Sequence, residues 1–516
     1  MNEPTTNVFG AAPPGTPGPQ RSLILAGGGM RVAYQAGVLR ALFEAGLTFA
    51  HADGTSGGTM NLGMLFSGLS PVEMCDRWRT LDVKHFASLM PIEDYLKAWD
   101  LPAMGDARGV TRQVFPHLGI DAGRINSATG MQGTFNVCNY TLKTSEVIPH
   151  QQIDLDLLVA GISLPIFMPP VEKNGFLYLD SVWIKDANLL EAVRRGSEEL
   201  WLVWCIGNLR EYKNGAFNQY VHMIELSANG RLFEEFKIIE EINARIRAGE
   251  TVEGHTRPIK LHVIKPEYAL PLDPDYFLGH IDAATLIDRG YSDARRYLAA
   301  MQPGGLPFQP EVTQMRDDTL GLTFREMLCG GFSWDEADPN TGEKKGAKTP
   351  LTLHAAIHIH DVHAFVSDPN HTADLYGDLT FAPWGENLSA ERGVFNLFCP
   401  AGEPDTKLMV YEIGFEHSGR QYYLAGRKEI RSGSGLELLK ESTTLYAQLH
   451  EGADKTGPVV GAGILHIGAS EIVNLVSSMH VTHAESAKTR LEALSDFGRF
   501  FLGELWESYH KSVVER

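Results

Sequence analysis

Short apolar runs alternate with longer amphipathic stretches along residues 21–302. A short run bounded by glycine or polar residues predicts a strand, and apolar residues that recur every three to four positions predict a helix. We therefore expect strands at 22–26, 47–50, 133–142, 176–179, 200–206 and 259–264. We expect helices at 32–45, 59–66, 211–250 and 283–299. This alternation indicates an α/β domain, in which the helix at 211–250 packs on the sheet and also contributes to a cover over a substrate site.

The pattern changes at about residue 322 to short alternating runs that turn residues separate. It predicts strands at 349–359, 379–381, 394–398, 407–415, 421–428, 443–449 and 459–467, which indicate an antiparallel sheet, a barrel or a sandwich. A last amphipathic helix is expected at 485–511, with an apolar stripe of Leu491, Leu494, Phe497, Phe501, Leu505 and Trp506. We favour packing of this helix against a domain, and contact with a membrane or a partner is the alternative.

These changes of pattern divide the chain into five parts. The boundary after residue 302 follows from the Pro- and Gly-rich stretch 301–305. We expect a disordered Pro- and Gly-rich tail at 1–20, the α/β domain at 21–302, a linker and extended segment at 303–350, the β-rich domain at 351–481 and the C-terminal helix at 482–516.

Composition narrows the classes of protein that fit this organisation. The chain is 43% hydrophobic and 21% charged, which is typical of a globular protein. A formal charge of −19 argues against nucleic-acid binding. The five cysteines are widely spaced, as expected of reduced thiols in a cytosol, and the longest apolar run, 200–206, is far too short to span a membrane. We therefore expect a cytoplasmic protein, with peripheral membrane contact as an open alternative.

A serine framed by glycines, Gly54-Thr55-Ser56-Gly57-Gly58, lies between an expected strand and an expected helix. Small neighbours allow the backbone to take a strained turn that exposes the serine hydroxyl. The helix N-terminus beneath the turn carries partial positive charge, which favours an alkoxide or an oxyanion. Ser56 is therefore a candidate nucleophile.

Three consecutive glycines, Gly27, Gly28 and Gly29, follow the first expected strand, and Arg31 comes two residues later. Bare N–H groups and a fixed positive charge at such a place suit a negatively charged oxygen. A tight turn that merely needs glycine, or a nucleotide-binding loop, is the alternative. The nucleotide interpretation is weak, because Val32 stands where the dinucleotide pattern requires glycine and no lysine follows in P-loop spacing.

Asp180 directly follows the expected strand at 176–179. Ligands of open α/β sheets are handled at the C-terminal ends of the strands. We therefore expect Asp180, Ser56 and the glycine run to meet at one edge of the sheet.

These motifs resemble those of patatin-like phospholipases. The residues that carry the resemblance are Gly27-Gly28-Gly29-Met30-Arg31, Gly54-Thr55-Ser56-Gly57-Gly58, Ser163-x-Pro165 with Pro169-Pro170, and Leu179-Asp180. The resemblance covers about residues 20–302 and implies a three-layer α/β/α lipid acyl hydrolase that uses a Ser/Asp dyad without histidine.

The resemblance also implies a role for each matching residue. Ser56 is then the nucleophile and Asp180 the base. Gly27, Gly28 and Gly29 form the oxyanion hole with Arg31 nearby, and the turn around the nucleophile is built by Gly54, Gly57 and Gly58. Two positions depart from the family pattern: Val32 replaces a glycine, and Ser181-Val182 replace the glycines that follow the base. Glycine at the second place lets the loop turn tightly under the serine, so Ser181-Val182 can shift the carboxylate.

The resemblance implies a phospholipase A-like enzyme that cleaves a phospholipid or another lipid ester through an acyl-serine, without a cofactor. The alternative is a catalytically weak or inactive lipid-binding or scaffold protein on the same fold. A Ser-His-Asp hydrolase is the nearest enzymatic rival, but His51 lies upstream of the serine and reads as an ordinary polar residue. The oligomeric state stays open.

The β-rich part raises two further questions. His354, His358, His360 and His363 suggest a metal site, but imidazoles on a solvated sheet face explain them better, so no metal is expected. The part is also similar to a β-rich module found beside GMC-type cholesterol and alcohol oxidases. That similarity rests on Asp368-Pro369-x-His371 and on the runs 378–381, 411–415, 443–446 and 460–465, and it implies no catalytic role.

Overall fold

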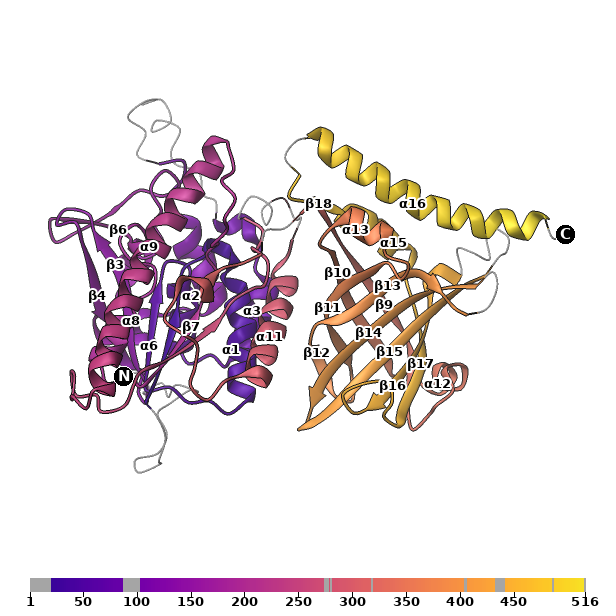
Figure 1. Ribbon diagram of the computed structural model, residues 1–516, viewed down its shortest axis with the longest axis horizontal. Helices are drawn as coiled ribbons and strands as arrows, with labels where there is room; N and C mark the ends of the chain where they lie inside the picture. Colours follow the sequence, from indigo (N-terminus) through magenta and orange to yellow (C-terminus); the bar gives the residue numbers. More distant parts are fainter. Residues whose placement is uncertain are drawn as a thin grey trace. The chain divides into compact units, whose positions relative to one another are not determined.

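The computed structural model describes residues 20–86, 103–272, 278, 281–316, 319–402, 406–431, 441–484 and 487–514, without the side chains of 469, 472, 473, 476, 487 and 502–514. Two compact units make up the chain, Met1–Asp317 and Asp318–Arg516. Both are drawn in Figure 1. The tail expected at 1–20 lies outside the described residues except for its last position.

A mixed sheet organises the first unit. Its strands are, in spatial order, β5 (Val171–Lys173), β6 (Phe176–Asp180), β3 (Gln132–Asn139), β2 (His51–Thr55), β1 (Arg21–Leu25), β7 (Glu199–Val203) and β8 (Lys260–Ile264), and β4 (Thr144–Pro149) also pairs with β3. The run from β3 to β8 is parallel, whereas β4 and β6 are antiparallel to β3. The sheet is therefore parallel in its centre and antiparallel at one edge.

Alternate residues of the central strands face two separate hydrophobic cores, because side chains along a strand point to opposite faces. Leu23 and Leu25 belong to one core and Ile24 to the other. The first core is covered by α1 (Ala33–Glu44), α2 (Gly58–Phe66), α3 (Pro71–Thr80), α5 (Phe115–Leu118), α6 (Ala122–Ser127), α7 (Leu155–Ala160) and α11 (Ala283–Ala300). The second is covered by α8 (Leu189–Arg194) and α9 (Ala216–Arg247). Figure 1 shows these two helical layers on either side of the sheet.

The second strand does not lie where the sequence pattern predicts it. The expected strand at 47–50 is wrong, and β2 occupies His51–Thr55 instead. Its buried Asp53 carboxylate accepts hydrogen bonds from the Thr134 hydroxyl (2.5 Å) and the Asn136 amide (2.6 Å) of β3. β2 therefore carries no apolar run, because hydrogen bonds to β3 compensate the burial of its polar Asp53 side chain.

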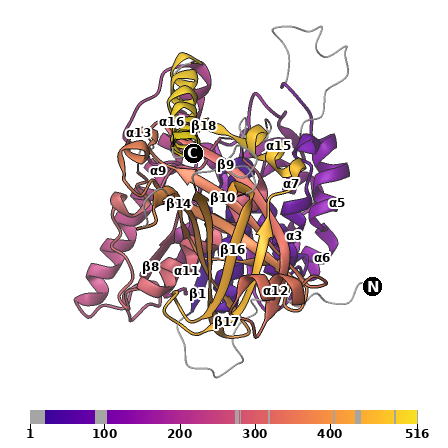
Figure 2. The same ribbon diagram turned by 90° about the vertical axis from the view of Figure 1, so that its right-hand side faces the viewer.

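A closed antiparallel sheet organises the second unit (Figure 2), which resolves the three alternatives in favour of a barrel. β9 (Gly321–Trp334) pairs with β10 on one side and β17 on the other, and this double pairing closes the ring. The other strands are β10 (Pro350–Ile359), β11 (Thr372–Phe381), β12 (Gly385–Ser389), β13 (Gly393–Pro400), β14 (Thr406–His417), β15 (Arg420–Arg431), β16 (Thr444–Glu451), β17 (Val459–His466) and β18 (His480–Thr482). β9 falls within 303–350, where the sequence suggests a linker and an extended segment, so the closed sheet begins at Gly321.

Helices border the closed sheet: α12 (Pro339–Lys345), α13 (Val362–Ser367), α15 (Ala469–Ser478) and α16 (Ala487–Val514). Phe497 of α16 is buried in the core of this unit, with its ring 6.4 Å from that of Phe324 and 6.2 Å from that of Phe365. Leu491 of the expected stripe is 68% exposed, and the side chains of Leu505 and Trp506 lie outside the described set. Across the described ranges, we find no helix with the length and apolar character that crossing a membrane requires.

One ion pair is buried inside the closed sheet. Lys428 of β15 lies 3.4 Å from the Glu326 carboxylate of β9, and both side chains are almost fully buried. The Tyr411 hydroxyl donates to Glu326 at 2.8 Å and lies 2.8 Å from the Lys428 ammonium. Burial lowers the pKa of Lys428, whereas the Glu326 charge raises it. Each charge therefore depends on the other for compensation.

We expect Lys428→Met to lower the free energy of unfolding by about 3–5 kcal/mol, because it leaves the Glu326 charge buried without its partner. Urea unfolding of the full chain measures this change. Adding Glu326→Gln to the same variant removes the orphaned charge and should restore most of the loss. If the free energy of unfolding of Lys428→Met lies within about 1 kcal/mol of the wild-type value, Glu326 does not need Lys428 to compensate its buried charge.

Candidate active site

Strand register brings Ser56 and Asp180 to the same level of the sheet. Thr55 of β2 is paired with Asn136 of β3, and the next residue of β3, Val137, is paired with Asp180 of β6. Ser56 follows Thr55 directly, so Ser56 and Asp180 flank β3. Asp180 ends an antiparallel strand rather than a parallel one, and it reaches the site from the opposite direction.

The turn at Ser56 has left-handed backbone geometry, with φ of 52°. This conformation is uncommon outside glycine and typically costs about 1–3 kcal/mol, so surrounding packing must hold it. Gly57 and Gly58, which follow Ser56, allow the turn to pack closely against neighbouring backbone. A Cβ on Gly57 would lie 2.5 Å from the Gly29 carbonyl oxygen, and a Cβ on Gly58 would lie 2.1 Å from the Leu25 carbonyl oxygen. The turn thus lies directly against the loop that follows β1.

The three glycines of that loop differ in what their N–H groups do. The Gly27 N–H donates to both carboxyl oxygens of Asp186, each at 3.0 Å. The Gly27 N–H therefore already has an acceptor, whereas the resemblance implies a place for it in the oxyanion hole. Gly29, with φ of 58°, begins a short 3-10 helix that ends at Val32. Within the described part of the chain, no acceptor is paired with the N–H of Gly28 or Gly29.

Arg31 supports the loop rather than standing apart from it. Its Nε donates to the Gly28 carbonyl oxygen at 3.0 Å, and its side chain also lines the adjacent cavity. Val32, which replaces the family glycine, is fully buried against the turn at Gly57. The larger side chain therefore fits without opening the loop.

Asp180 is completely buried next to Ser56. Its Oδ1 accepts the Val182 N–H at 2.9 Å, while Oδ2 has no hydrogen-bond partner within the described residues. Burial raises the pKa of Asp180 to about 7, although the nearby Ser56 hydroxyl and the Val182 N–H both lower it. A carboxyl with such a pKa can accept and return a proton near neutral pH.

Ser181 and Val182 occupy the positions where the family has glycines, and the structure accommodates both. Neither residue has a positive φ, so the turn does not require glycine. Together with Trp183 they form a short 3-10 helix, which the Asp180 side chain caps. The Ser181 hydroxyl is 3.0 Å from that of Ser145 in β4. The turn after Asp180 is therefore stabilised by hydrogen bonds.

A cavity of about 410 Å³ opens beside Ser56 and the glycine loop. Its walls are mostly apolar and include Met60, Val110, Ile162, Leu164, Met168, Val182 and Ile206, together with Phe217, Tyr220, Val221 and Ile224 of α9. The same helix buries Phe236 and Ile239 in the second core of the unit. α9 thus packs on the sheet and also forms one wall of the cavity.

His51 does not take part in the site. It is the first residue of β2, and its ring nitrogens lie 2.9 Å from the hydroxyls of Ser22 and Thr134. Burial, with a contribution from the Arg195 charge, lowers the pKa of His51 to about 3. The residue is a neutral, hydrogen-bonded core histidine.

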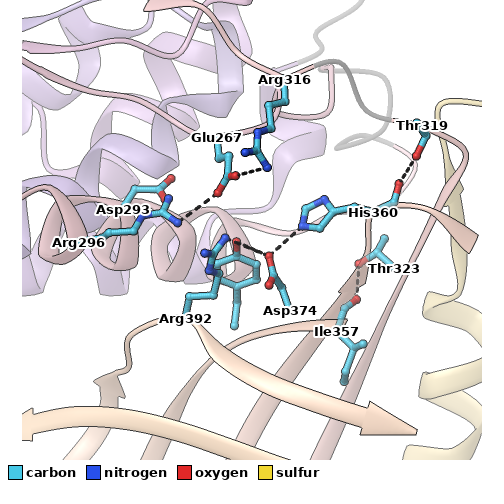
Figure 3. A network of polar contacts seen from close by, with 11 residues as sticks. Glu267, Asp293, Arg296, Arg316, Thr319, Thr323, Ile357, His360, Asp374 and Arg392 are labelled. Atoms are coloured by element: carbon cyan, nitrogen blue, oxygen red, sulfur yellow. Dashed lines mark hydrogen bonds and ion pairs between the residues drawn. The ribbon is translucent and has the colours of Figure 1, made fainter. Parts of the chain in front are cut away.

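Two of the four histidines that suggest a metal site, His354 and His360, pair with carboxylates. His354 lies 2.9 Å from the Asp378 carboxylate, and His360 lies 2.8 Å from that of Asp374. Figure 3 shows Arg392 reaching the same Asp374 carboxylate, at 3.3 Å. No group of three or more His, Cys, Asp or Glu side chains within the described ranges has a metal-binding arrangement. These imidazoles form individual pairs with carboxylates.

Two residues that border the site, Asp186 and Tyr220, could not be predicted from the sequence. Asp186 lies six residues beyond Asp180 in a segment without a recognisable pattern, and Tyr220 is one of many aromatic residues in a long helix. The Tyr220 hydroxyl donates to the Pro165 carbonyl at 2.9 Å. Their placement depends on tertiary contacts, which a single sequence does not encode locally.

Part of the first unit is similar to a known protein family. Residues 23–193 match the family model of patatin-like phospholipases. The match includes the glycine loop, Ser56, Asp180 and Asp186, and it indicates lipid acyl hydrolase activity in general. None of the curated proteins matches the chain. Among solved structures, VipD from Legionella pneumophila is 13% identical, with a TM-score of 0.30 over 55% of this chain and 67% of that one. At that TM-score the likeness does not bear on fold or function.

We expect ester hydrolysis to require ionised Asp180. The kcat/KM for a soluble ester should rise about tenfold per pH unit below pH 7 and level off above it, because the pKa of Asp180 is about 7. Initial rates between pH 5 and 9 measure the profile. Burial also raises the pKa of Asp53 to about 7, so Asp53→Asn serves as a control that should leave the midpoint in place. A flat profile between pH 5 and 8 would contradict the assignment.

Proposed function

We propose that the first unit hydrolyses carboxylic esters of lipids through an acyl-serine intermediate. The observation that carries this proposal is the strained Ser56 turn, because Ser56 both lines an apolar cavity and neighbours a buried carboxyl of raised pKa. Strain of this kind persists where function requires it and surrounding packing maintains it. The match of residues 23–193 to patatin-like phospholipases supports the same chemistry.

The reaction we infer has two balanced steps. Asp180 accepts the Ser56 proton while Oγ attacks the ester carbonyl, and the N–H groups of Gly28 and Gly29 stabilise the resulting oxyanion. Collapse of this intermediate passes the proton from Asp180 to the leaving alcohol and leaves an acyl group on Ser56. Asp180 then accepts a proton from the water that attacks the acyl-serine. As the second intermediate collapses, Asp180 returns this proton to Ser56 Oγ and the fatty acid leaves. Asp180 therefore serves as base in each attack and as acid in each collapse.

The cavity supports a substrate with an acyl chain. Its charged lining residues are Arg31, Asp106 and Glu225, and nearly all others are apolar. A hydrocarbon chain gains free energy on entering such a space, whereas a polar substrate loses hydration without compensation. A phospholipid or another lipid ester fits this requirement, and the inferred steps involve no cofactor.

Ser56→Ala should lower the turnover of a chromogenic short-chain ester by at least about 10³-fold, because it removes the attacking atom. A fluorophosphonate probe should label the wild type and not the variant. Equal rates of wild type and variant would contradict the enzymatic proposal. Lipid binding by a wild type without turnover would instead favour the lipid-binding or scaffold alternative.

We further infer that the mouth of the cavity takes substrate from a lipid aggregate. Met104, Phe167 and Phe217 line the cavity and remain exposed, and neighbouring Ile166 is 55% exposed. Backbone hydrogen bonds from Met104 to Ile166 (2.7 Å) and from Gly105 to Phe167 (3.1 Å) join the two loops that carry these side chains. Apolar groups at the mouth of an apolar cavity can enter a lipid surface and lose their contact with water.

Ile166→Ser should lower the rate on micellar phospholipid by about tenfold, because the serine forfeits the transfer of an apolar side chain into lipid. The rate on a water-soluble ester should stay within about twofold of wild type. Phe43→Ser is the matched control, because Phe43 is also exposed but lies at the end of α1 distant from the glycine loop. Equal losses on both substrates would show that Ile166 acts on the site and not on the lipid surface.

A further inference from the structure

Both edges of the peptide group that joins Ala26 to Gly27 are held by side chains. Its carbonyl oxygen accepts the Gln35 amide of α1 at 2.6 Å. Its N–H donates to the Asp186 carboxyl at 3.0 Å to each oxygen. Gln35 and Asp186 are both fully buried. Because a peptide group is planar, two contacts on opposite edges fix its orientation.

Among the described residues, the peptide group between Gly28 and Gly29 has partners at one edge only. Its carbonyl oxygen accepts Nε of Arg31 at 3.0 Å and the Arg31 N–H at 3.2 Å. The opposite edge of this plane is the Gly29 N–H, which therefore points away from Arg31. The peptide between Gly27 and Gly28 lies between these two anchored planes. Gln35, Asp186 and Arg31 are thus the side chains that anchor the loop and orient its remaining donors.

We propose that Asp186 is a positioning residue for ester hydrolysis, which occupies the Gly27 N–H and so directs the N–H groups of Gly28 and Gly29 toward the substrate oxyanion. The proposal rests on the proposed function. A Cβ on Gly27 would lie 2.4 Å from Asp186 Oδ1 and 2.7 Å from Ser56 Cβ, so the Asp186 carboxyl and Ser56 both lie against Gly27. A displacement of Asp186 is therefore transmitted to both the donors and Ser56.

The segment that carries Asp186 is anchored on both sides. Lys185 lies 2.8 Å from the buried Glu235 carboxylate of α9, and it also donates to Asn188 at 2.8 Å. Asn188 in turn donates to Asn136 of β3 at 3.1 Å. These contacts make Asp186 part of a rigid support, as a positioning group requires.

Asp186 does not compete with Asp180 for the role of base. Both Asp186 oxygens accept from the same N–H, whereas one Asp180 oxygen has no hydrogen-bond partner among the residues that the structure describes. Burial raises the pKa of Asp186 well above its usual range, and the Asp180 charge raises it further, against the lowering effects of Gly27 and Arg31. A raised pKa favours the protonated form of Asp186, which places less negative charge beside the developing oxyanion.

The test compares Asp186→Asn with Asp186→Ala. The asparagine keeps a neutral acceptor for Gly27, so kcat on a soluble ester should stay within about threefold of wild type. The alanine removes the acceptor, and kcat should fall about 10²-fold, the typical effect of a lost oxyanion donor, with KM changed by less than threefold. Asp121→Ala is the matched control: it also removes a carboxylate acceptor from a backbone N–H, that of Arg124 at 2.7 Å, but at the start of α6.

Hydrogen exchange of the segment 23–35, measured by mass spectrometry, provides a readout that does not depend on turnover. Exchange should accelerate in Asp186→Ala and stay unchanged in Asp186→Asn and Asp121→Ala. Wild-type kcat and wild-type exchange in Asp186→Ala would overturn the proposal, and so would an asparagine variant as slow as the alanine variant. If the wild type lacks Ser56-dependent turnover, the proposed function fails, while the exchange data still decide whether Asp186 holds the loop.

Discussion

The site depends on a close approach between two backbone segments that no side chain separates. The turn after β2 contacts the loop after β1 through Gly57 and Gly58, where any Cβ would overlap a carbonyl oxygen. This contact holds Ser56 in a left-handed conformation that an isolated chain rarely adopts. It also places the hydroxyl and the loop donors on the same side of the sheet. Substitution of either glycine would separate Ser56 from the loop that carries Gly28 and Gly29.

Beneath the turn, a buried polar network connects the elements that carry the site. Asn136 of β3 donates to the Asp53 carboxylate and to the Thr55 hydroxyl at 2.9 Å, and its own carbonyl accepts from Asn188. Lys185 continues the network to Glu235 of α9. Fully satisfied networks of this kind rigidify a core, since an unpaired member is costly. The helix that forms a wall of the cavity is thereby linked to the strand that precedes Ser56.

How much of this could be predicted from the sequence depends on whether the signal is local. Ser56 and the glycine loop have short-range signatures, because a strained turn needs small neighbours within two residues. Asp180 follows a recognisable apolar run. The position of β2 could not be predicted from an apolar run, because β2 buries the polar Asp53. The Asp53 carboxylate is satisfied by hydrogen bonds from β3 instead of by apolar contacts. The role of Asp186 could not be predicted either, because its partner Gly27 lies 159 residues away and the two meet only in the folded chain. The closed sheet was one of three alternatives, and only the double pairing of β9 decides among them.

The central claim is that Ser56 attacks an ester whose oxyanion faces the N–H groups of Gly28 and Gly29. A crystal structure of the protein treated with a long-chain alkyl fluorophosphonate tests it most directly. The account predicts phosphorus bonded to Ser56 Oγ, the phosphonyl oxygen within about 3.1 Å of both N atoms, and the alkyl chain inside the apolar cavity. Phosphorus on another residue, or a phosphonyl oxygen turned away from the glycine loop, would contradict it.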